Sequence, residues 1–194
     1  MNKNPKLKGD LLLEFFSEEI PARMQTESEK QLKDLFKKSL DKRKINYGDF
    51  KSYSGPRHLS IKINELDLIQ NNQILELRGP RLGSNKNAIN GFLKSNKIKM
   101  SDLEIKDTQN GKFYFYSSEI LGIKTSEALP EIISEIMYGF VWSKSQRWGN
   151  SDLKWGRPLR NILLILNDKM VNGEVSIGKN EHLKFTNFTY GHRY

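Results

Sequence analysis

The chain has 194 residues, of which 37% are hydrophobic and 28% are charged. A chain of this length and mixture can bury a real core, in one domain of above-average size or in two small ones, which excludes a disordered protein. The lack of cysteine excludes disulfides, thiolate chemistry and Cys-based zinc sites. No apolar run approaches the roughly eighteen residues of a membrane span, so we expect a soluble, cytoplasmic protein with no membrane partner.

The charge balance is strongly basic, with 32 Lys and Arg against 23 Asp and Glu and a formal net charge of +9. Such an excess favours an acidic partner, and nucleic acid is the most common one. A second interpretation stays open, because Lys, Asn and Ile are all abundant, and compositional bias alone would produce a Lys-rich solvated surface. Composition therefore indicates a class of partner without assigning one.

The first part of the chain predicts a strand, a long helix and two further strands. Residues 11–16 are apolar except for Glu14 and fit a mostly buried strand, in which Glu14 needs a partner. Pro21 suits the first turn of a helix whose apolar residues recur at helical spacing to about Lys44. Two short strands are predicted next, at 50–53 and 59–64.

The middle of the chain predicts a hairpin accompanied by a helix. A strand at 74–77 runs into an Arg-bearing turn at 78–83, which lacks the spacing and the Lys-Ser/Thr ending of a Walker P-loop. Asn110-Gly111 is a strong hairpin signal between two extended segments. The further elements predicted here are a helix at 87–97, a strand-like stretch at 101–106 and a strand at 112–120.

Aromatic residues alternate along the strand that follows the hairpin turn, where Phe113 and Phe115 share one face. Such a stripe can form a base-stacking platform, as in sheets that bind RNA. Core packing is the favoured interpretation, because the consensus of RNA-recognition sheets is absent.

The last part predicts a helix from Thr125 and then a continuous apolar strand at 162–166, which turns at Asn167-Asp168 and pairs with residues 170–177. A polar connection at 179–183 and a strand at 185–190 follow. Together the elements predict an α+β fold of largely antiparallel strands and hairpins with about three helices. Because no linker or repeat interrupts them, we expect residues 1–194 to form a single compound domain.

Residues 147–160 have neither helical nor strand periodicity and are predicted to form an ordered loop. Gly149 and Gly156 permit positive φ or close approach of the backbone, and Pro158 fixes its own φ. The guanidinium groups suit bidentate contact with phosphate or carboxylate, and the two indoles can stack on a base or anchor the loop in a core. From these residues alone both roles stay open, although we favour anchoring for both Trp residues.

No pattern in the sequence assembles a catalytic site, since Ser-His-Asp spacing, HExxH and Cys are all missing. Glu18 and Glu19 are adjacent, and sequence neighbours diverge on a strand or around a helix. Helix capping or a subunit contact is therefore favoured over paired acid–base chemistry. His182 and His192 stand ten residues apart with no carboxylate cluster beside them, so no metal site is predicted.

Several short motifs occur in a fixed order along the chain. They are Leu12-Leu13-Glu14, Ser17-Glu18-Glu19-Ile20-Pro21, Gly55-Pro56-Arg57-His58-Leu59, Arg78-Gly79-Pro80, Gly91-Phe92, Arg147-Trp148-Gly149, Gly156-Arg157-Pro158-Leu159-Arg160 and Gly191-His192-Arg193-Tyr194. This ordered set resembles the β subunit of bacterial heterotetrameric glycyl-tRNA synthetase. The family usually has TPRRL where this chain has GPRHL, and GHRF where it has GHRY. Because the family's subunit is several times longer, the resemblance indicates an amino-terminal fragment.

The resemblance implies that ATP-dependent attachment of glycine takes place on a separate α subunit, which holds ATP and Mg²⁺, and that this chain binds no cofactor. The implied partners are the α subunit, the remainder of β and tRNA(Gly), in an α2β2 heterotetramer. The expected role is tRNA binding and subunit assembly without the aminoacylation active site. The alternative is a free-standing basic RNA-binding domain. The candidate tRNA or subunit contacts are Arg57, Arg78, Arg81, Arg147, Lys154, Arg157, Arg160, His192 and Arg193.

Overall fold

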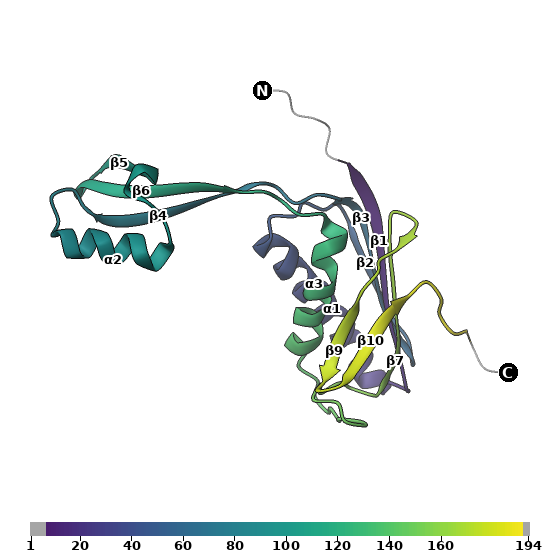
Figure 1. Ribbon diagram of the computed structural model, residues 1–194. Helices are drawn as coiled ribbons and strands as arrows, with labels where there is room; N and C mark the ends of the chain where they lie inside the picture. Colours follow the sequence, from purple (N-terminus) through teal and green to yellow (C-terminus); the bar gives the residue numbers. More distant parts are fainter. Residues whose placement is uncertain (1–6, 192–194) are drawn as a thin grey trace. The chain divides into compact units, whose positions relative to one another are not determined.

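The computed structural model describes residues 7–191 of the chain (Figure 1). Residue contacts divide these residues into two compact units, and each is described by itself. The main unit comprises 7–70 and 123–191, and the inserted unit is Asn71–Gly122. Compact units of one chain can still fold together, so the expected single compound domain stays a prediction about cooperative folding.

Both units combine helices with strands. The elements of the main unit are β1 (Lys8–Ser17), α1 (Ala22–Lys42), β2 (Phe50–Ser54), β3 (His58–Asp67), α3 (Thr125–Gly139), β7 (Leu159–Leu166), β8 (Lys169–Met170), β9 (Glu174–Gly178) and β10 (Glu181–Thr186). Those of the inserted unit are β4 (Gln73–Arg81), α2 (Lys86–Asn96), the 3-10 helix η1 (Met100–Asp102), β5 (Leu103–Thr108) and β6 (Gly111–Ile120). Three α-helices and mostly antiparallel strands in the described part of the chain confirm the predicted α+β class.

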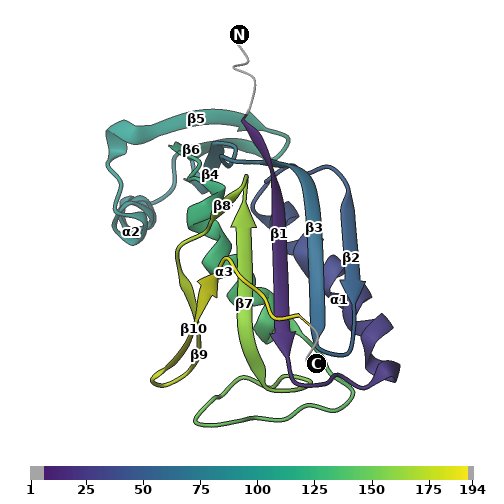
Figure 2. The same cartoon turned by 90° about the vertical axis from the view of Figure 1, so that its right-hand side faces the viewer.

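The described strands of the main unit form one seven-stranded sheet, called here the main sheet. Its order is β2-β3-β1-β7-β10-β9, and β8 pairs with β7. The central strand β1 is antiparallel to β3 and to β7, whereas β7 and β10 run parallel. Figure 2 shows α1 and α3 behind the sheet, while the segment after β10 crosses the other face in front of β7 and β1.

The core lies between the main sheet and its two helices. Alternate residues of β1 point to the helices, so Leu11, Leu13 and Phe15 are fully buried. Each buried side chain of this size contributes about 1.5–3 kcal/mol to the stability of the fold. The helices supply the opposite wall, with Leu32, Phe36 and Leu40 from α1 and Leu129, Ile132, Ile133 and Ile136 from α3.

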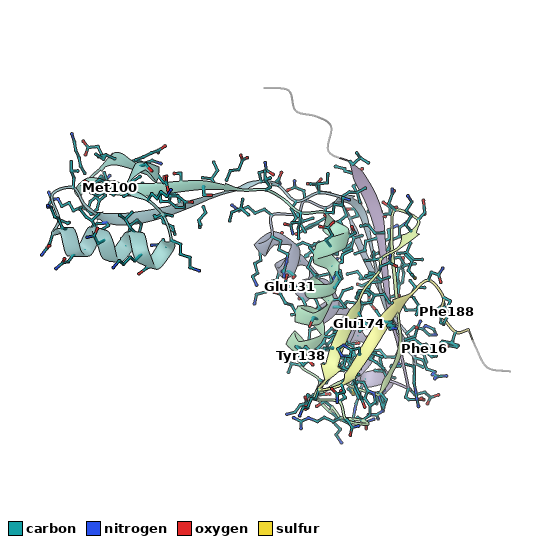
Figure 3. All side chains as sticks on the ribbon, viewed as in Figure 1. Phe16, Met100, Glu131, Tyr138, Glu174 and Phe188 are labelled. Carbon is teal, nitrogen blue, oxygen red and sulfur yellow. The ribbon has the colours of Figure 1, made fainter. Side chains whose placement is uncertain are left out.

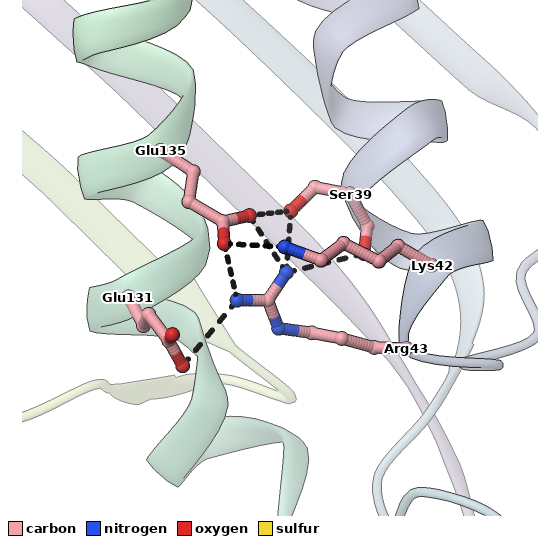
Figure 4. A network of polar contacts seen from close by, with 5 residues as sticks. All are labelled: Ser39, Lys42, Arg43, Glu131 and Glu135. Carbon is pink, nitrogen blue, oxygen red and sulfur yellow. Dashed lines mark hydrogen bonds and ion pairs between the residues drawn. The ribbon is translucent and has the colours of Figure 1, made fainter.

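A polar network joins α1 to α3 beside this core (Figure 4). Arg43 donates to both carboxylate oxygens of Glu135, at 2.7 and 3.0 Å, and lies 3.3 Å from Glu131. Ser39 and Lys42 also donate to Glu135. Chiefly through the Arg43 hydrogen bonds, the network lowers the pKa of Glu135 to about 2. The two helices are therefore linked by a charge-assisted contact as well as by apolar packing.

The inserted unit is a three-stranded antiparallel sheet in the order β4-β6-β5, with α2 packed on one face. The packing is close where the two elements meet, because a Cβ added to Gly79 would lie 2.9 Å from the ring of Phe92. Of the side chains that the structure describes in this unit, none is fully buried. The unit therefore lacks the kind of core that the main unit has.

The predicted turn at 78–83 is wrong in its first half, because β4 continues through Arg81. The pairing of β4 with β6 has a register shift between Arg78 and Arg81, which is a bulge that contains Pro80. A proline is tolerated at a bulge because its missing N–H removes no ladder hydrogen bond there. The bulge thus keeps both Arg residues on a strand.

The predicted pairing of 162–166 with 170–177 is also largely wrong. Lys169 and Met170 pair with β7, the Val171 backbone N–H donates to the Leu164 carbonyl, and the chain then leaves this hairpin at Gly173, which has φ +149°. β9 pairs instead with β10, which starts at Glu181 inside the segment predicted as a polar connection. The new partner allows Val175 and Ile177 of β9 to be buried in the core.

Candidate nucleic-acid interface

The predicted loop is anchored to the main unit by its tryptophans. Gln146 and Trp155 exchange two backbone hydrogen bonds of 2.9 and 3.2 Å, which closes the segment into a hairpin-like shape. The Trp155 side chain is fully buried, with its ring centroid 5.2 Å from that of Phe15 and 4.7 Å from that of Phe140. Trp148 is half-buried and packs against the same core. The favoured anchoring role is confirmed for Trp155, and the packing of Trp148 agrees with it.

The two glycines of the loop have the roles that the sequence suggests. Gly149 has φ +54°, and the adjacent Asn150 donates its backbone N–H to Glu181 of β10 at 2.9 Å. At Gly156 the backbone approaches the ring of Trp142 so closely that a Cβ would lie 2.6 Å from it. Ser151 adds a further tie by donating to the Ile177 carbonyl of β9. The backbone of the loop is therefore fixed at several points.

Two cations stand next to the Gln146–Trp155 bridge in sequence, both toward the tip of the loop. Arg147 follows Gln146 and Lys154 precedes Trp155, and both side chains are exposed. Neither makes an ion pair with any residue that the structure describes. Each of these exposed cations is therefore free to pair with an anion such as a phosphate.

A second group of predicted residues meets at Glu18. Arg160 of β7 donates to one of its oxygens at 2.7 Å, and Arg57 lies 3.6 Å from the other. Arg57 also donates to the Ser17 carbonyl and lies 4.5 Å from the ring centroid of Phe16, so its guanidinium is held on three sides. Because Glu18 neutralises part of this charge, the pair is better suited to a protein contact than to a polyanion.

The group around Glu18 adjoins the face of the main sheet that α1 and α3 do not cover. Figure 3 places Phe16 and Phe188 on the side opposite Glu131 of α3. Tyr190 stacks on Phe16 with ring centroids 5.0 Å apart. The half-buried Glu14, expected to need a partner, lies 3.2 Å from Nδ1 of His58 and accepts from the Thr189 hydroxyl.

The remaining predicted residues divide between several places. Arg157 donates to the Gly156 carbonyl within the loop. Arg78 and Arg81 belong to the inserted unit, where the guanidinium of Arg78 lies 3.8 Å from the ring centroid of Phe113. His192 and Arg193 lie outside the described residues. The structure therefore places Arg57 and Arg160 on the same carboxylate and Arg147 and Lys154 next to the two residues of one bridge, and it does not assemble one site from the whole set.

Sequence reasoning missed the residues that hold the loop in place. Gln31 of α1 exchanges side-chain amide hydrogen bonds with both backbone groups of Val141, whose side chain is 78% exposed. Glu181 fixes Asn150 from a stretch that had been interpreted as a polar connection. Both contacts span long sequence separations, so no local pattern could have indicated them.

Neither a metal centre nor a membrane helix is found within residues 7–191. No group of three or more His, Asp or Glu side chains in this range could hold a metal ion. His182 faces a single carboxylate, that of Glu174, at 3.3 Å. No helix there is long and apolar enough to cross a membrane.

A formal net charge of +9 with exposed cations on an ordered loop, unpaired among the described residues, is a common property of proteins that contact nucleic acid. Residues 11–194 match the model of a family described as the glycyl-tRNA synthetase beta subunit. The chain therefore belongs to the glycyl-tRNA synthetase β-subunit family, as the ordered motifs predicted.

Curated relatives agree with this assignment. The glycine–tRNA ligase beta subunit of Rickettsia canadensis (strain McKiel) is 38% identical over 185 residues, which cover 95% of this chain and 27% of the relative. The corresponding subunit of Rickettsia felis is 37% identical over 186 residues, covering 96% and 27%. That of Rickettsia bellii (strain OSU 85-389) is 36% identical over 185 residues, covering 95% and 27%. The chain spans about a quarter of the length of these relatives, which are aminoacyl-tRNA synthetase subunits.

Proposed function

We propose that this chain is the amino-terminal part of a glycine–tRNA ligase β subunit that works in the cytoplasm and supports ATP-dependent attachment of glycine to tRNA(Gly). Its role is to bind tRNA and to assemble the subunits, and the aminoacylation site, with ATP and Mg²⁺, belongs to the α subunit of an α2β2 enzyme. The observation that carries the tRNA role is the uncompensated pair of Arg147 and Lys154 on a loop fixed by Trp155.

The anchored backbone makes this pair suited to phosphate. A flexible cation loses conformational entropy when it binds, whereas a loop that is already held by buried contacts loses less. Each phosphate contact also releases counterions, so it contributes affinity that does not depend on base sequence. The loop would accordingly position tRNA and leave the identification of the bases to other residues.

The assembly role rests on different residues. Arg57 and Arg160 share Glu18, and Arg57 also lies over the ring of Phe16, on which the 51% exposed Tyr190 stacks. A polar rim with exposed apolar residues is typical of protein interfaces. We therefore assign Arg57 and Arg160 to contact with the α subunit or the rest of β, and Arg147 with Lys154 to tRNA.

The tRNA role is tested with the double variant Arg147→Gln/Lys154→Gln in the assembled α and β subunits. The Michaelis constant for tRNA should rise, and the slope of log affinity against log salt should fall by about 1.4 to 1.8 for two lost contacts. Glycine-dependent ATP–pyrophosphate exchange should not change. The control variant Lys30→Gln/Lys38→Gln removes the same charge from exposed positions on α1. If the control lowered tRNA affinity equally, the loop would contribute only through its part of the net charge, and its specific role would be refuted.

The division of labour between the subunits has its own test. The 194-residue chain alone should give background ATP–pyrophosphate exchange with glycine. Robust exchange by the purified chain would overturn the assignment of the active site to the α subunit.

A further inference from the structure

The inserted unit has an open sheet face that carries an aromatic and cationic surface. Gly79 faces Phe92 of α2, so the alternation of side chains places Leu77 on the helix-covered face and Arg78 on the other. Cross-strand pairing puts Phe115 opposite Arg78. Among the described residues of the inserted unit, no element covers this second face, which we call the open face.

Contacts on the open face agree with this placement. The Arg78 guanidinium lies over the ring of Phe113, 3.8 Å from its centroid, and Lys106 lies over the ring of Phe115 at 5.4 Å. The predicted core role of these two rings is therefore wrong, since both are only half-buried and each carries a cation. The sequence had left base stacking as the less favoured interpretation.

The charge on the open face is unevenly compensated. Lys106 pairs with Glu76 and lies 3.9 Å from Glu104, so its charge is fully compensated and these three side chains together carry one negative charge. Arg78 and Arg81 make no ion pair with any residue in the described part of the chain. The end of the open face at Phe113 therefore combines a surface for stacking with the positive charge of Arg78 and Arg81.

We propose that the open face binds an unpaired stretch of RNA, with a base stacked on the Arg78–Phe113 pair and phosphate paired with Arg81. Guanidinium planes and aromatic rings are the surfaces on which proteins stack unpaired bases. The guanidinium of Arg81 reaches back over the turn, because a Cβ on Gly111 would lie 2.9 Å from it. The inference takes its class of ligand from the proposed function, but it uses residues of the other unit.

Single-stranded RNA fits this face better than duplex RNA or protein. Duplex bases are already stacked on each other and offer no free ring face to Arg78. A protein partner of ordinary composition would need a contiguous apolar surface, whereas here cations cover both rings. The cations and rings of the open face are therefore complementary to an anionic chain that also carries flat rings.

The test measures binding of a fluorescent oligouridine and of a short blunt RNA duplex to the 194-residue chain at low ionic strength. Phe113→Leu removes the ring and keeps an apolar side chain, and Arg78→Lys keeps the charge and removes the planar group. Each should weaken oligouridine binding about fivefold to a hundredfold. Duplex binding should stay the same.

Tyr114→Leu is the matched control, because it removes an aromatic ring from the next position of β6, on the helix-covered face. It should leave both affinities unchanged, and circular dichroism verifies that every variant is folded. The proposal is overturned if the wild-type chain does not bind oligouridine. It is also overturned if Phe113→Leu and Arg78→Lys leave both RNA affinities unchanged, or if they weaken binding of oligouridine and of the duplex to the same extent. Unchanged RNA binding with weaker binding of the α subunit would identify the open face as a protein interface instead.

The loop variant Arg147→Gln/Lys154→Gln separates this inference from the proposed function. It should weaken binding of the duplex and of oligouridine alike, since phosphates are common to both. If the loop variant left both affinities unchanged while Phe113→Leu weakened oligouridine binding, the RNA role of the loop would be refuted and that of the open face supported. If the loop variant weakened both affinities and Phe113→Leu weakened neither, the open face would be refuted and the loop supported.

Discussion

The main unit and the inserted unit are built from similar elements but stabilised in different ways. In the main unit, residues such as Phe15, Phe36 and Trp155 are fully buried between the sheet and the helices. In the inserted unit, cation–aromatic contacts such as Arg78 with Phe113 lie on a half-exposed sheet. Burial of one large apolar side chain contributes about 1.5–3 kcal/mol, whereas an exposed cation–π contact contributes about 0.5–1 kcal/mol. We infer that most of the stability resides in the main unit.

The same difference separates the two candidate RNA contacts. Arg147 and Lys154 are carried by a loop whose backbone is fixed by a buried side chain, so the main unit offers a preorganised pair of charges. The inserted unit offers flat stacking groups on a surface without a deep core. A unit of low local stability can adjust to its ligand, which suits an unpaired strand more than a regular duplex.

The largest expected effect compares one aromatic residue from each unit. Trp155→Ala should lower the free energy of unfolding by about 3–5 kcal/mol, because it opens a cavity among fully buried rings. Phe92→Ala should lower it by less, because Phe92 is only half-buried between α2 and β4. Urea unfolding followed by circular dichroism measures both. Equal losses would contradict the difference drawn between the units.

A pair of glycine substitutions sharpens the comparison. Gly156→Ala should destabilise the main unit by about 1–3 kcal/mol, because the added Cβ would lie 2.6 Å from the Trp142 ring. Gly91→Ala should stabilise α2 by about 0.5–1 kcal/mol, because Gly91 is inside a helix and faces open space. Thermal melts of both variants should shift in opposite directions. A destabilising Gly91→Ala would show that something packs against α2 at this position.

The sequence predicted the elements of both units much better than their partners. The periodicity of α1 and the hairpin signal of Asn110-Gly111 are local, and both elements were confirmed, although the turn residues are Gln109 and Asn110 and Gly111 already belongs to β6. The pairing of β9 with β10 was missed, because Asn167-Asp168 does form a turn but the chain leaves the hairpin at Gly173. Partner choice depends on which side chains reach the core, and that is decided by residues far away in sequence.

For the candidate sites, too, the sequence indicated individual residues better than their spatial partners. The motif residues of the loop could be singled out from their chemistry, and Trp155 was correctly expected to be an anchor. The meeting of Arg57 and Arg160 at Glu18 joins three separate segments, which no spacing in the sequence indicates. Phe113 was assigned to a core because alternation identifies a shared face but not what covers it.

The link between α1 and α3 predicts a pH dependence that belongs to the main unit. The folded pKa of Glu135 is about 2 against an ordinary 4.5, so its contribution is present above about pH 4.5 and is lost as the pH falls towards 2. The side chain is 35% exposed, and screening by solvent reduces the contribution to about 1 kcal/mol. Glu135→Gln should therefore destabilise the chain by about this amount at neutral pH.

Unfolding measured between pH 2 and pH 7 checks this expectation, and the difference between wild type and Glu135→Gln should shrink as the solution is acidified. The control Glu19→Gln removes the charge of an exposed carboxylate that makes no contact with the α1–α3 network, so it should not reproduce the loss of stability seen with Glu135→Gln at neutral pH. A constant difference at all pH values would mean that Glu135 acts through packing and not through its charge.

The smallest expected effect is that of removing the inserted unit. Gln70 donates its backbone N–H to Ile123 at 3.0 Å, and Ile69 bridges to Lys124, so the two ends of the main unit are already paired where the insertion departs. Deletion of residues 72–121 joins Asn71 to Gly122 and thereby creates an Asn-Gly pair, the preferred two-residue hairpin turn. Because no described side chain of the inserted unit is fully buried, the free energy of unfolding measured in urea should stay within about 0.5 kcal/mol of the wild-type value. Loss of folding in the deleted chain would show that both units share one cooperative transition, as the expected single compound domain requires. Retained folding, together with weakened oligouridine binding and preserved duplex binding, would place the core in one unit and the stacking surface in the other.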